Sequence, residues 1–387
     1  MRSASVVIVG AGVMGASVAY HLAARGWSDV LMVDRSDGPG QGSTGVATGG
    51  FRAQYGTAIN VRLSLLAREK FLRFRDEIGV DPGYIPAGYL WLAETRAELD
   101  GLRAGLEVQR AEGLHEATEI GVKDVGLINP AVLRESVLGA TFCPTDGFIA
   151  PLQVLGGYLA AALRAGARLE WDTAVTGLIR DEKGSIAAVE TSRGRIATEA
   201  VVNAAGAWAA GLALHAGVTL PVTPLRRQIA VTVPCSLLPP TTPMTIFVGD
   251  GFHFRVRDGR VLLLWPTPGV PGKPFDVSVD GEWIAQVSTT ARSRVPVLDQ
   301  VAIDVACCRA GLYEMSPDRH ALLGPAPGCD NLFLVNGSSG HGVMHAPALG
   351  QLLAEIMSDG VATTVDVRAL RPSRFMEGEP NQTSGPL

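Results

Sequence analysis

Three glycines near the start of the chain are spaced for phosphate binding. Gly10, Gly12 and Gly15 lie in VVIVGAGVMG, between an apolar run typical of a β-strand and an alanine-rich stretch typical of a helix. The first glycine permits a tight turn, the second lets a pyrophosphate approach the backbone, and the third lets the helix pack against the strand. Asp34 follows about twenty residues later, where an acidic side chain binds a ribose. The pattern predicts a dinucleotide-binding βαβ unit; an ordinary glycine-containing turn is the alternative.

The composition is that of a globular protein whose partners are small molecules or another protein. The 387 residues are 47% hydrophobic and 18% charged, which supplies a substantial interior, and the length favours two domains. The net charge of -5 offers no basic surface for nucleic acid or an anionic membrane. Apolar runs are too short to predict a transmembrane segment.

The cysteines indicate a reduced protein. Their number is odd, and their spacing fits neither a disulfide framework nor a metal site; they are Cys143, Cys235, Cys307, Cys308 and Cys329. We therefore expect a cytoplasmic protein without a bound metal. The apolar N-terminal stretch could be mistaken for a secretory signal, but glycines interrupt it and no cleavage site follows.

Other segments must position the dinucleotide unit. Hairpin signals at DEKG and SRG predict a β-meander that returns to the first sheet. The last stretch reads as strand, glycine loop and helix, with Pro347 in the first helical turn. Further helices are predicted over 58–78, ended by Gly79, over 96–112 and over 152–164, and strands over GYLWLA, FHFRV and VLLLW.

Four separated motifs resemble one family. The GxGxxG start, STGVATGGFRAQYG, GLYEMSPDRHALLG and GSSGHGVMHAPALG occur in the order found in the FAD-dependent D-amino-acid oxidase superfamily. The chain is most similar to the sarcosine oxidases of the monomeric and β-subunit types, to glycine oxidase and to related amino-acid dehydrogenases. The resemblance runs from near residue 1 to about residue 360 and is looser over 81–144 and 222–308.

The resemblance implies an α/β fold in which a Rossmann-like FAD-binding domain carries an inserted, mainly antiparallel α+β substrate domain. We assign residues 1–80, 145–221 and 315–387 to the FAD-binding domain. The substrate domain then comprises residues 81–144 and 222–314.

A second glycine loop distinguishes FAD from a nicotinamide cofactor. One dinucleotide unit suffices for a nicotinamide, whereas the longer FAD needs backbone donors at its flavin end, which GSSGHG before a helix can supply. A purely structural loop is the alternative. The residues assigned to FAD are Gly10, Gly12, Val13, Met14, Gly15, Asp34, Arg35, Gly42, Ser43, Thr44, Thr48, Gly49, Gly50, Val175, Ala205, Gly206, Trp208, Gly337, Ser338, Gly340, His341, Gly342, Val343 and Met344.

Arg52 is the leading candidate for substrate binding. In the resemblance to monomeric sarcosine oxidase it matches the arginine that holds the substrate carboxylate, and a planar guanidinium can grip a carboxylate through two hydrogen bonds. A solvated surface arginine is the alternative. Tyr313 aligns with a variable pocket position, and Tyr55 could also face the cavity.

Two further candidates lie on one strand. His253 and Arg255 share one face, because side chains alternate along a strand, with Phe252 and Phe254 on the other. A histidine and an arginine on an exposed strand face are more often solvated than catalytic, so a solvated face is the alternative. His320 and His345 are assigned only capping or surface roles.

Departures from the family pattern refine the predictions of how FAD is attached and of what accepts its electrons. Gly311 stands where monomeric sarcosine oxidase tethers its flavin through a cysteine, and Cys308 is three residues too early. STGVATGG lacks the tethering histidine of the sarcosine and dimethylglycine dehydrogenases. We therefore expect non-covalent FAD.

Two lysines of the oxidase are also replaced. Leu262 or a neighbour occupies the position of the lysine that activates oxygen in the monomeric oxidase, which makes a dehydrogenase credible. Met344 replaces the lysine that follows GHGF in that oxidase. The electron acceptor is thus oxygen or another carrier.

The predicted function is oxidation of the C–N bond of a small amino acid or N-alkyl amino acid, such as sarcosine, glycine or proline. Arg52 holds the carboxylate, the neutral amine places a C–H bond over flavin N5, hydride transfer gives an imine, and water hydrolyses it. Activity should then rise with pH. The alternatives are an FAD-dependent 2-hydroxy-acid dehydrogenase with His253 as base, and a subunit of a multi-subunit dehydrogenase completed by partner subunits.

Overall fold

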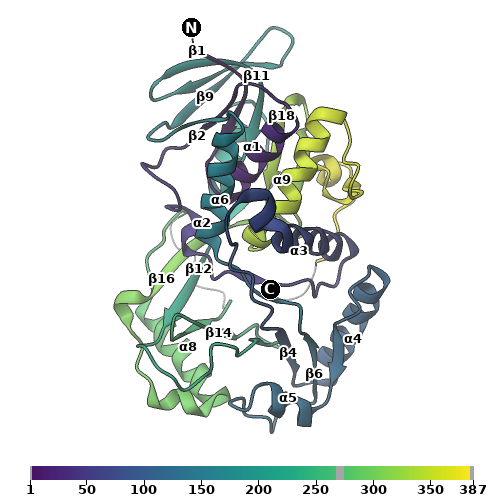
Figure 1. Cartoon of the computed structure of the whole chain (residues 1–387), viewed down its shortest axis with the longest axis vertical. Helices are drawn as coiled ribbons and strands as arrows, with labels where there is room; N and C mark the ends of the chain where they lie inside the picture. Colours follow the sequence, from purple (N-terminus) through teal and green to yellow (C-terminus); the bar gives the residue numbers. More distant parts are fainter. Residues whose placement is uncertain (1, 267–273, 384–387) are drawn as a thin grey trace.

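The computed structural model describes residues 2–266 and 274–383. Figure 1 shows a sheet with several helices at one end of the molecule and a second sheet at the other. The chain passes between the two sheets several times, so each is built from segments that are distant in sequence. This arrangement confirms the predicted α/β fold class.

The first sheet is mainly parallel. Its central strands run in the order β18, β11, β1, β2 and β8, all parallel, while β17 pairs antiparallel with β18. The predicted meander is confirmed, because β9, β10 and β11 pair antiparallel in turn and β11 then lies beside β1. The strands are β1 (Arg2–Val9), β2 (Val30–Val33), β8 (Arg168–Glu170), β9 (Val175–Arg180), β10 (Ile186–Thr191), β11 (Gly194–Asn203), β17 (Leu322–Ala326) and β18 (Cys329–Asn336).

Side chains of the first sheet alternate between two cores. Val6 and Ile8 pack with the helices α1, α6 and α9, whereas Val7 and Val9 pack on the opposite face with α7. Burial on both faces explains the nearly continuous apolar run of β1. The helices are α1 (Val13–Ala24), α2 (Ser43–Val46), α3 (Ala58–Ile78), α4 (Arg96–Ala111), α5 (Val122–Ile128), α6 (Pro151–Arg164), α7 (Ala209–Leu214), α8 (Gly281–Arg294) and α9 (Gly342–Asp359).

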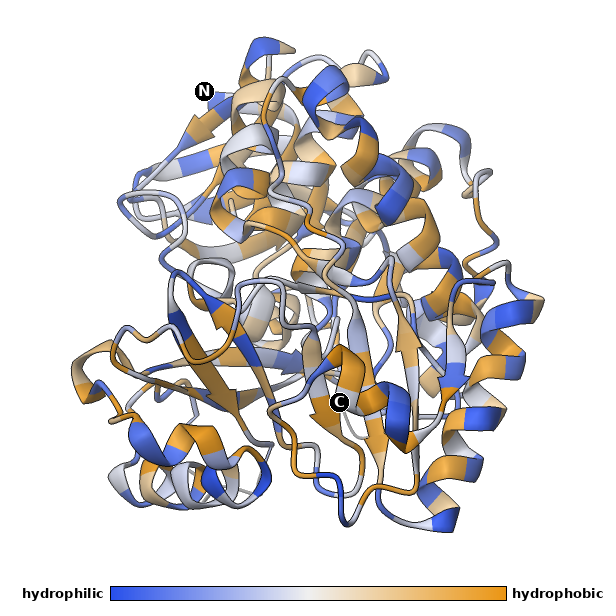
Figure 2. Cartoon of the chain, turned by 60° about the horizontal axis from the view of Figure 1, so that its bottom comes forward, coloured by the Kyte–Doolittle hydropathy of each residue, from blue (hydrophilic) through white to orange (hydrophobic). Residues whose placement is uncertain are grey.

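The second sheet is mainly antiparallel, with order β16, β12, β15, β14, β13, β4, β6, β5 and one parallel contact between β13 and β4. One face packs on α8 through Trp283, Ile284 and Val287. In Figure 2, hydrophilic and hydrophobic segments alternate along the outer helices, as expected for helices with one buried face. The strands are β4 (Tyr89–Ala93), β5 (Thr118–Ile120), β6 (Gly139–Cys143), β12 (Thr223–Val231), β13 (Met244–Phe247), β14 (His253–Arg257), β15 (Arg260–Leu264) and β16 (Arg309–Met315).

The predicted helices and strands agree closely with these bounds. Gly79 ends α3 in the left-handed conformation, as expected of a helix C-cap glycine. A short pair of strands, β3 (Gly50–Phe51) and β7 (Gly147–Phe148), joins segments on either side of β4 to β6. β3 directly precedes Arg52, which places that residue between the two sheets.

Candidate active site

A cavity of about 660 Å³ is lined by residues of both sheets. The first sheet contributes the ends of β1 and β2, and the second contributes residues of β12, β13, β15 and β16. This size lies within the range of cofactor and ligand sites, towards its upper part. The predicted dinucleotide loop and the second glycine loop both line this cavity.

The helices that follow the two loops lie side by side. Ser17 Oγ on α1 donates a 2.8 Å hydrogen bond to the Ala346 carbonyl on α9. Gly350 permits this approach, because a Cβ there would clash with Ser17. Both helices begin at the cavity, and neither N-cap residue, Gly12 or His341, caps its helix with a side chain. First-turn N–H groups that no N-cap side chain occupies suit an anionic ligand.

The first loop has the geometry that its spacing predicts. Gly10 has φ +107°, and a Cβ there would clash with the Ala204 carbonyl. Gly15 does not line the cavity; a Cβ at Gly15 would clash with the Gly10 carbonyl, so its role is close packing. Asp34 lines the cavity and accepts hydrogen bonds from the amides of Ala11 and Ser36, both at 2.8 Å.

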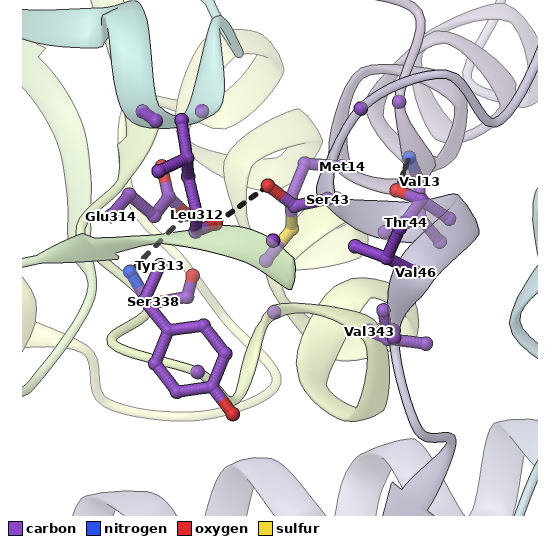
Figure 3. Close-up of a pocket in the computed structure, with 18 of the residues that line it drawn as sticks. Val13, Met14, Ser43, Thr44, Val46, Leu312, Tyr313, Glu314, Ser338 and Val343 are labelled. Carbon is purple, nitrogen blue, oxygen red and sulfur yellow. Dashed lines mark hydrogen bonds between the residues drawn. The ribbon is translucent and has the colours of Figure 1, made fainter. Parts of the chain in front are cut away.

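The segment after β2 joins the loop to the second sheet. Thr44 Oγ1 accepts a 3.3 Å hydrogen bond from Val13 N–H, and Ser43 Oγ donates at 2.6 Å to the Leu312 carbonyl of β16 (Figure 3). Further predicted residues from this segment and from the neighbouring strands also line the cavity: Arg35, Gly42, Thr48, Gly49, Gly50, Val175, Ala205, Gly206 and Trp208. The Arg35 guanidinium lies 3.8 Å from the centroid of the Trp208 ring.

The second glycine loop contributes Ser338, Gly340, His341, Gly342, Val343 and Met344 to the cavity wall. Gly340 packs against the Tyr313 ring, and a Cβ there would clash with it. Gly337 does not line the cavity. It has φ +69°, and its Cβ position is blocked by Leu322, so it forms the turn that leads into the loop.

Arg52 is a buried part of the cavity wall. Its Nη2 lies 3.2 Å from His341 Nε2, which must accept because a guanidinium only donates. Its guanidinium carbon lies 4.6 Å from the Tyr55 ring centroid and 5.0 Å from that of Trp91. Buried Asp146 accepts from Ala53 N–H at 2.7 Å and thereby fixes the chain after Arg52. The alternative of a solvated surface arginine is wrong.

Tyr55 supports Arg52 and does not itself line the cavity. Its hydroxyl donates to Met344 Sδ at 3.2 Å, and burial raises its pKa to about 12. The expectation that Tyr55 faces the cavity is therefore wrong, because its ring is packed beneath the guanidinium and its polar end is already bonded.

His253 and Tyr313 both line the cavity. His253 Nδ1 lies 2.8 Å from the Gly251 carbonyl, which can only accept, so Nδ1 carries the proton and Nε2 is an acceptor. Burial lowers the pKa of His253 to about 4, and the charges of Arg52 and Arg227 contribute. Burial raises the pKa of Tyr313.

The expectation of a solvated strand face is wrong. Arg255 is 6% exposed, donates to the Thr48 carbonyl at 2.5 Å and packs on Phe148. His320 and His345 are also buried, bonded to Thr57 at 3.0 Å and to Ser64 at 2.8 Å. The sequence pattern missed these partners because they are distant along the chain.

Three charged residues among the described cavity lining were not predicted: Arg227, Glu314 and Arg319. Glu314 Oε1 accepts a hydrogen bond from Ser338 N–H at 3.3 Å (Figure 3), and burial raises its pKa to about 7. Arg227 lines the cavity from β12. Glu314 is adjacent to the predicted Tyr313, which was an available signal; Arg227 reaches the site only through the pairing of β12 with β16.

The structure shows the surroundings of the residues expected to bear on covalent attachment of the flavin and on its reaction with oxygen. A Cβ at Gly311 would clash with Val46, so that position has little room for a larger side chain. Among the described cavity-lining residues there is no cysteine and no lysine. Leu262 is buried in an apolar cluster, while Leu264 of the same strand lines the cavity.

The arrangement fits FAD. Two adjacent helix N-termini can meet a pyrophosphate and the negative charge that a flavin ring carries after reduction, and the cavity-lining Asp34 can meet a ribose hydroxyl. In the described part of the chain, no three His, Cys, Asp or Glu side chains are grouped as a metal site, and no helix is long and apolar enough to cross a membrane.

Fold and cavity together define a Rossmann-type flavoprotein oxidoreductase. The profile of the DAO family, described as FAD-dependent oxidoreductase, matches residues 5–356, and the chain belongs to this family. Its cofactor is accordingly FAD.

Individual proteins support this assignment. Glycine oxidase of Geobacillus kaustophilus is 29% identical, over 91% of this chain and 92% of its own length. The 4-methylaminobutanoate oxidase (formaldehyde-forming) of Paenarthrobacter nicotinovorans is 26% identical over 94% of this chain, which spans only 45% of that protein. The crystal structure of L-proline dehydrogenase from P. horikoshii superposes with a TM-score of 0.89, at 28% identity, covering 98% of this chain and 100% of that one.

Proposed function

We propose that this FAD-dependent oxidoreductase oxidises the C–N bond of a small amino acid or N-alkyl amino acid. The observation that carries the proposal is the buried guanidinium of Arg52 in the wall of the cavity, beside the start of α9. A buried arginine there suits a substrate carboxylate, and the relatives include a glycine oxidase and an L-proline dehydrogenase.

The protein's own contribution is binding and orientation. The backbone at the cavity-lining start of α1 and the carboxylate of Asp34 would hold the adenosine diphosphate part, and the start of α9 would hold the flavin end. Bound FAD supplies the electron-accepting ring. Arg52 fixes the carboxylate, stacked on Tyr55 so that its own rotation is limited.

His253 would accept a hydrogen bond from the amine through Nε2. Its pKa of about 4 keeps it neutral at neutral pH, so it does not repel a cationic or neutral amine. The same pKa makes it a poor general base for a 2-hydroxy acid at neutral pH. The amine reaction is therefore the better supported of the two.

An absorbance spectrum followed by anaerobic titration tests the proposal. The purified protein should show a flavin spectrum that bleaches with glycine, sarcosine or proline. Bleaching by 2-hydroxy acids alone would assign the rival chemistry. Mixing the reduced protein with air-saturated buffer, and separately with an artificial acceptor, then distinguishes oxygen from a carrier and shows whether partner subunits are required.

We also propose a cytoplasmic location. All five cysteines are free, as expected in a reducing compartment. Cell fractionation with antibody detection tests this proposal, and recovery of the protein outside the cytoplasmic fraction would contradict it.

A further inference from the structure

Besides Arg52, three described arginines line the cavity: Arg35, Arg227 and Arg319. Arg227 lies on β12 directly opposite Gly311 on β16, and Leu225 lies opposite Tyr313. Since directly opposed residues of an antiparallel pair point to the same face, Arg227 and Tyr313 share a face of the sheet. The Arg227 guanidinium carbon lies 5.9 Å from the Tyr313 ring centroid.

Arg227 has no ion-pair partner among the residues that the structure describes. Its neighbour Arg226 pairs with Asp276 at 3.0 Å, whereas within the described residues no carboxylate forms an ion pair with Arg227. Burial lowers the pKa of Arg227, and the nearby charge of Arg319 acts in the same direction. The Arg227 side chain is partly buried, and a partly desolvated cation without a counter-ion is costly, so this environment favours a bound anion.

Arg52 and Arg227 act on the same part of the cavity. Both charges lower the pKa of His253, and both favour the ionised form of Tyr313. Among the described residues, the carboxyl groups that line the cavity are Asp34 and Glu314. Asp34 is bonded at the first glycine loop, and Glu314 has a pKa of about 7, so neither cancels both arginines.

We propose that Arg227 is a specificity-determining residue that binds a second carboxylate, so that the preferred substrate is a dicarboxylic amino acid or N-alkyl amino acid. This inference rests on the proposed amine oxidation at the same site. Arg52 binds the carboxylate next to the reacting carbon, Arg227 binds the distal carboxylate, and His253 accepts from the amine between them.

Matched substrates and inert ligands test the assignment. N-methylaspartate and N-methylglutamate should be oxidised with kcat/KM at least about tenfold above that of N-methylalanine, which lacks the distal charge. Glutarate, which cannot be oxidised at a C–N bond, should perturb the flavin spectrum at lower concentration than butyrate.

Variants at position 227 separate specificity from folding. Arg227→Gln should lower kcat/KM for the dicarboxylates roughly 10- to 100-fold and leave the monocarboxylate and FAD affinity within about twofold. Arg227→Lys keeps the charge and should recover part of the preference. Arg96 lies on the exposed first turn of α4. Arg96→Gln removes one positive charge, as Arg227→Gln does, and should change neither the substrate preference nor the FAD affinity.

Each outcome has a definite meaning. Equal loss for both substrate classes in Arg227→Gln, loss of FAD, or no preference in the wild type would overturn the assignment. Glutarate binding that depends on Arg227, with no amine oxidised, would support the two-carboxylate site and remove the proposed reaction. Amine oxidation without any dicarboxylate preference would support the proposed reaction and remove the two-carboxylate site.

Discussion

Arg374 and Asp318 form a buried ion pair with two parallel hydrogen bonds, Nε to Oδ2 at 2.8 Å and Nη2 to Oδ1 at 2.9 Å. Both side chains are almost fully excluded from solvent. Asp318 lies in the loop after β16, next to the cavity-lining Arg319, and Asn381 also donates to it. The C-terminal segment is thereby fastened to the wall of the cavity.

Removing this arginine should destabilise both fold and site. Arg374→Ala leaves a buried carboxylate without its partner, so we expect a loss of about 3–5 kcal/mol in the free energy of unfolding and weaker FAD binding. Thermal melting and flavin titration measure the two effects. Arg368→Ala, which breaks an exposed pair with Asp366, should cost under about 1 kcal/mol. Similar losses in both variants would contradict the account.

Arg52 variants should separate substrate binding from cofactor binding. Arg52→Ala should lower kcat/KM for amino acids roughly 100-fold, the scale of a lost charge-assisted hydrogen-bond pair. Arg52→Lys should be intermediate, because an ammonium cannot form the two-pronged contact. The flavin spectrum should stay the same in both. Steady-state kinetics measures the two values of kcat/KM, and unchanged turnover in Arg52→Ala would remove the assigned role.

Glu314 should make stability depend on pH. Its pKa rises from 4.5 to about 7 in the folded protein, so the folded state holds this proton more tightly than the unfolded chain. Its contribution is fully present below about pH 4.5 and is lost as the pH rises through 7, by up to about 3 kcal/mol. Glu314→Gln should lack this fall. Urea unfolding of wild type and variant at pH 5 and pH 8 measures the difference; parallel changes would disprove the role.

Gly340 should tolerate no side chain. In Gly340→Ala the new Cβ meets the Tyr313 ring in a backbone with φ +93°, so we expect displacement of Tyr313 and a raised KM. Gly360→Ala is the matched control, since it has φ +80° but nothing within 4 Å. It carries the same kind of backbone strain without the clash. Steady-state kinetics and thermal melting should therefore show a larger difference between the two variants in KM than in Tm.

The flavin should leave the protein on denaturation. No cysteine lines the described cavity, and Gly311 is closed off by Val46. Acid precipitation should place the yellow colour in the supernatant, where chromatography identifies FAD. Colour retained in the pellet would demonstrate a covalent bond.

Local sequence patterns were enough to predict the cofactor loops. Gly10, Gly12 and Gly15 specify a turn and a helix contact within a few residues, and the loop before α9 has the same kind of local signal. The strands that lead into these loops, β1 and β18, are rich in apolar residues and were recognisable as strands for the same reason. For this reason the fold class and the two loops were predictable without coordinates.

The substrate side was less predictable, because its residues meet through long-range pairing. Arg227 enters the cavity only because β12 pairs with β16. Tyr55 lies three residues from Arg52 and yet packs behind it against Met344. His345 looks like a surface residue until α9 is placed against Ser64 of α3. Spacing along the chain does not report which side of a loop faces the cavity.

The position of β1 has a consequence for biosynthesis. This strand is completed on one side by β11 from the middle of the chain, and the second glycine loop follows β18. A nascent chain therefore carries an open β1 edge until β11 has been made. Both ends of the flavin can be held only after α9 has been made, so the complete FAD site forms after most of the described chain has been synthesised.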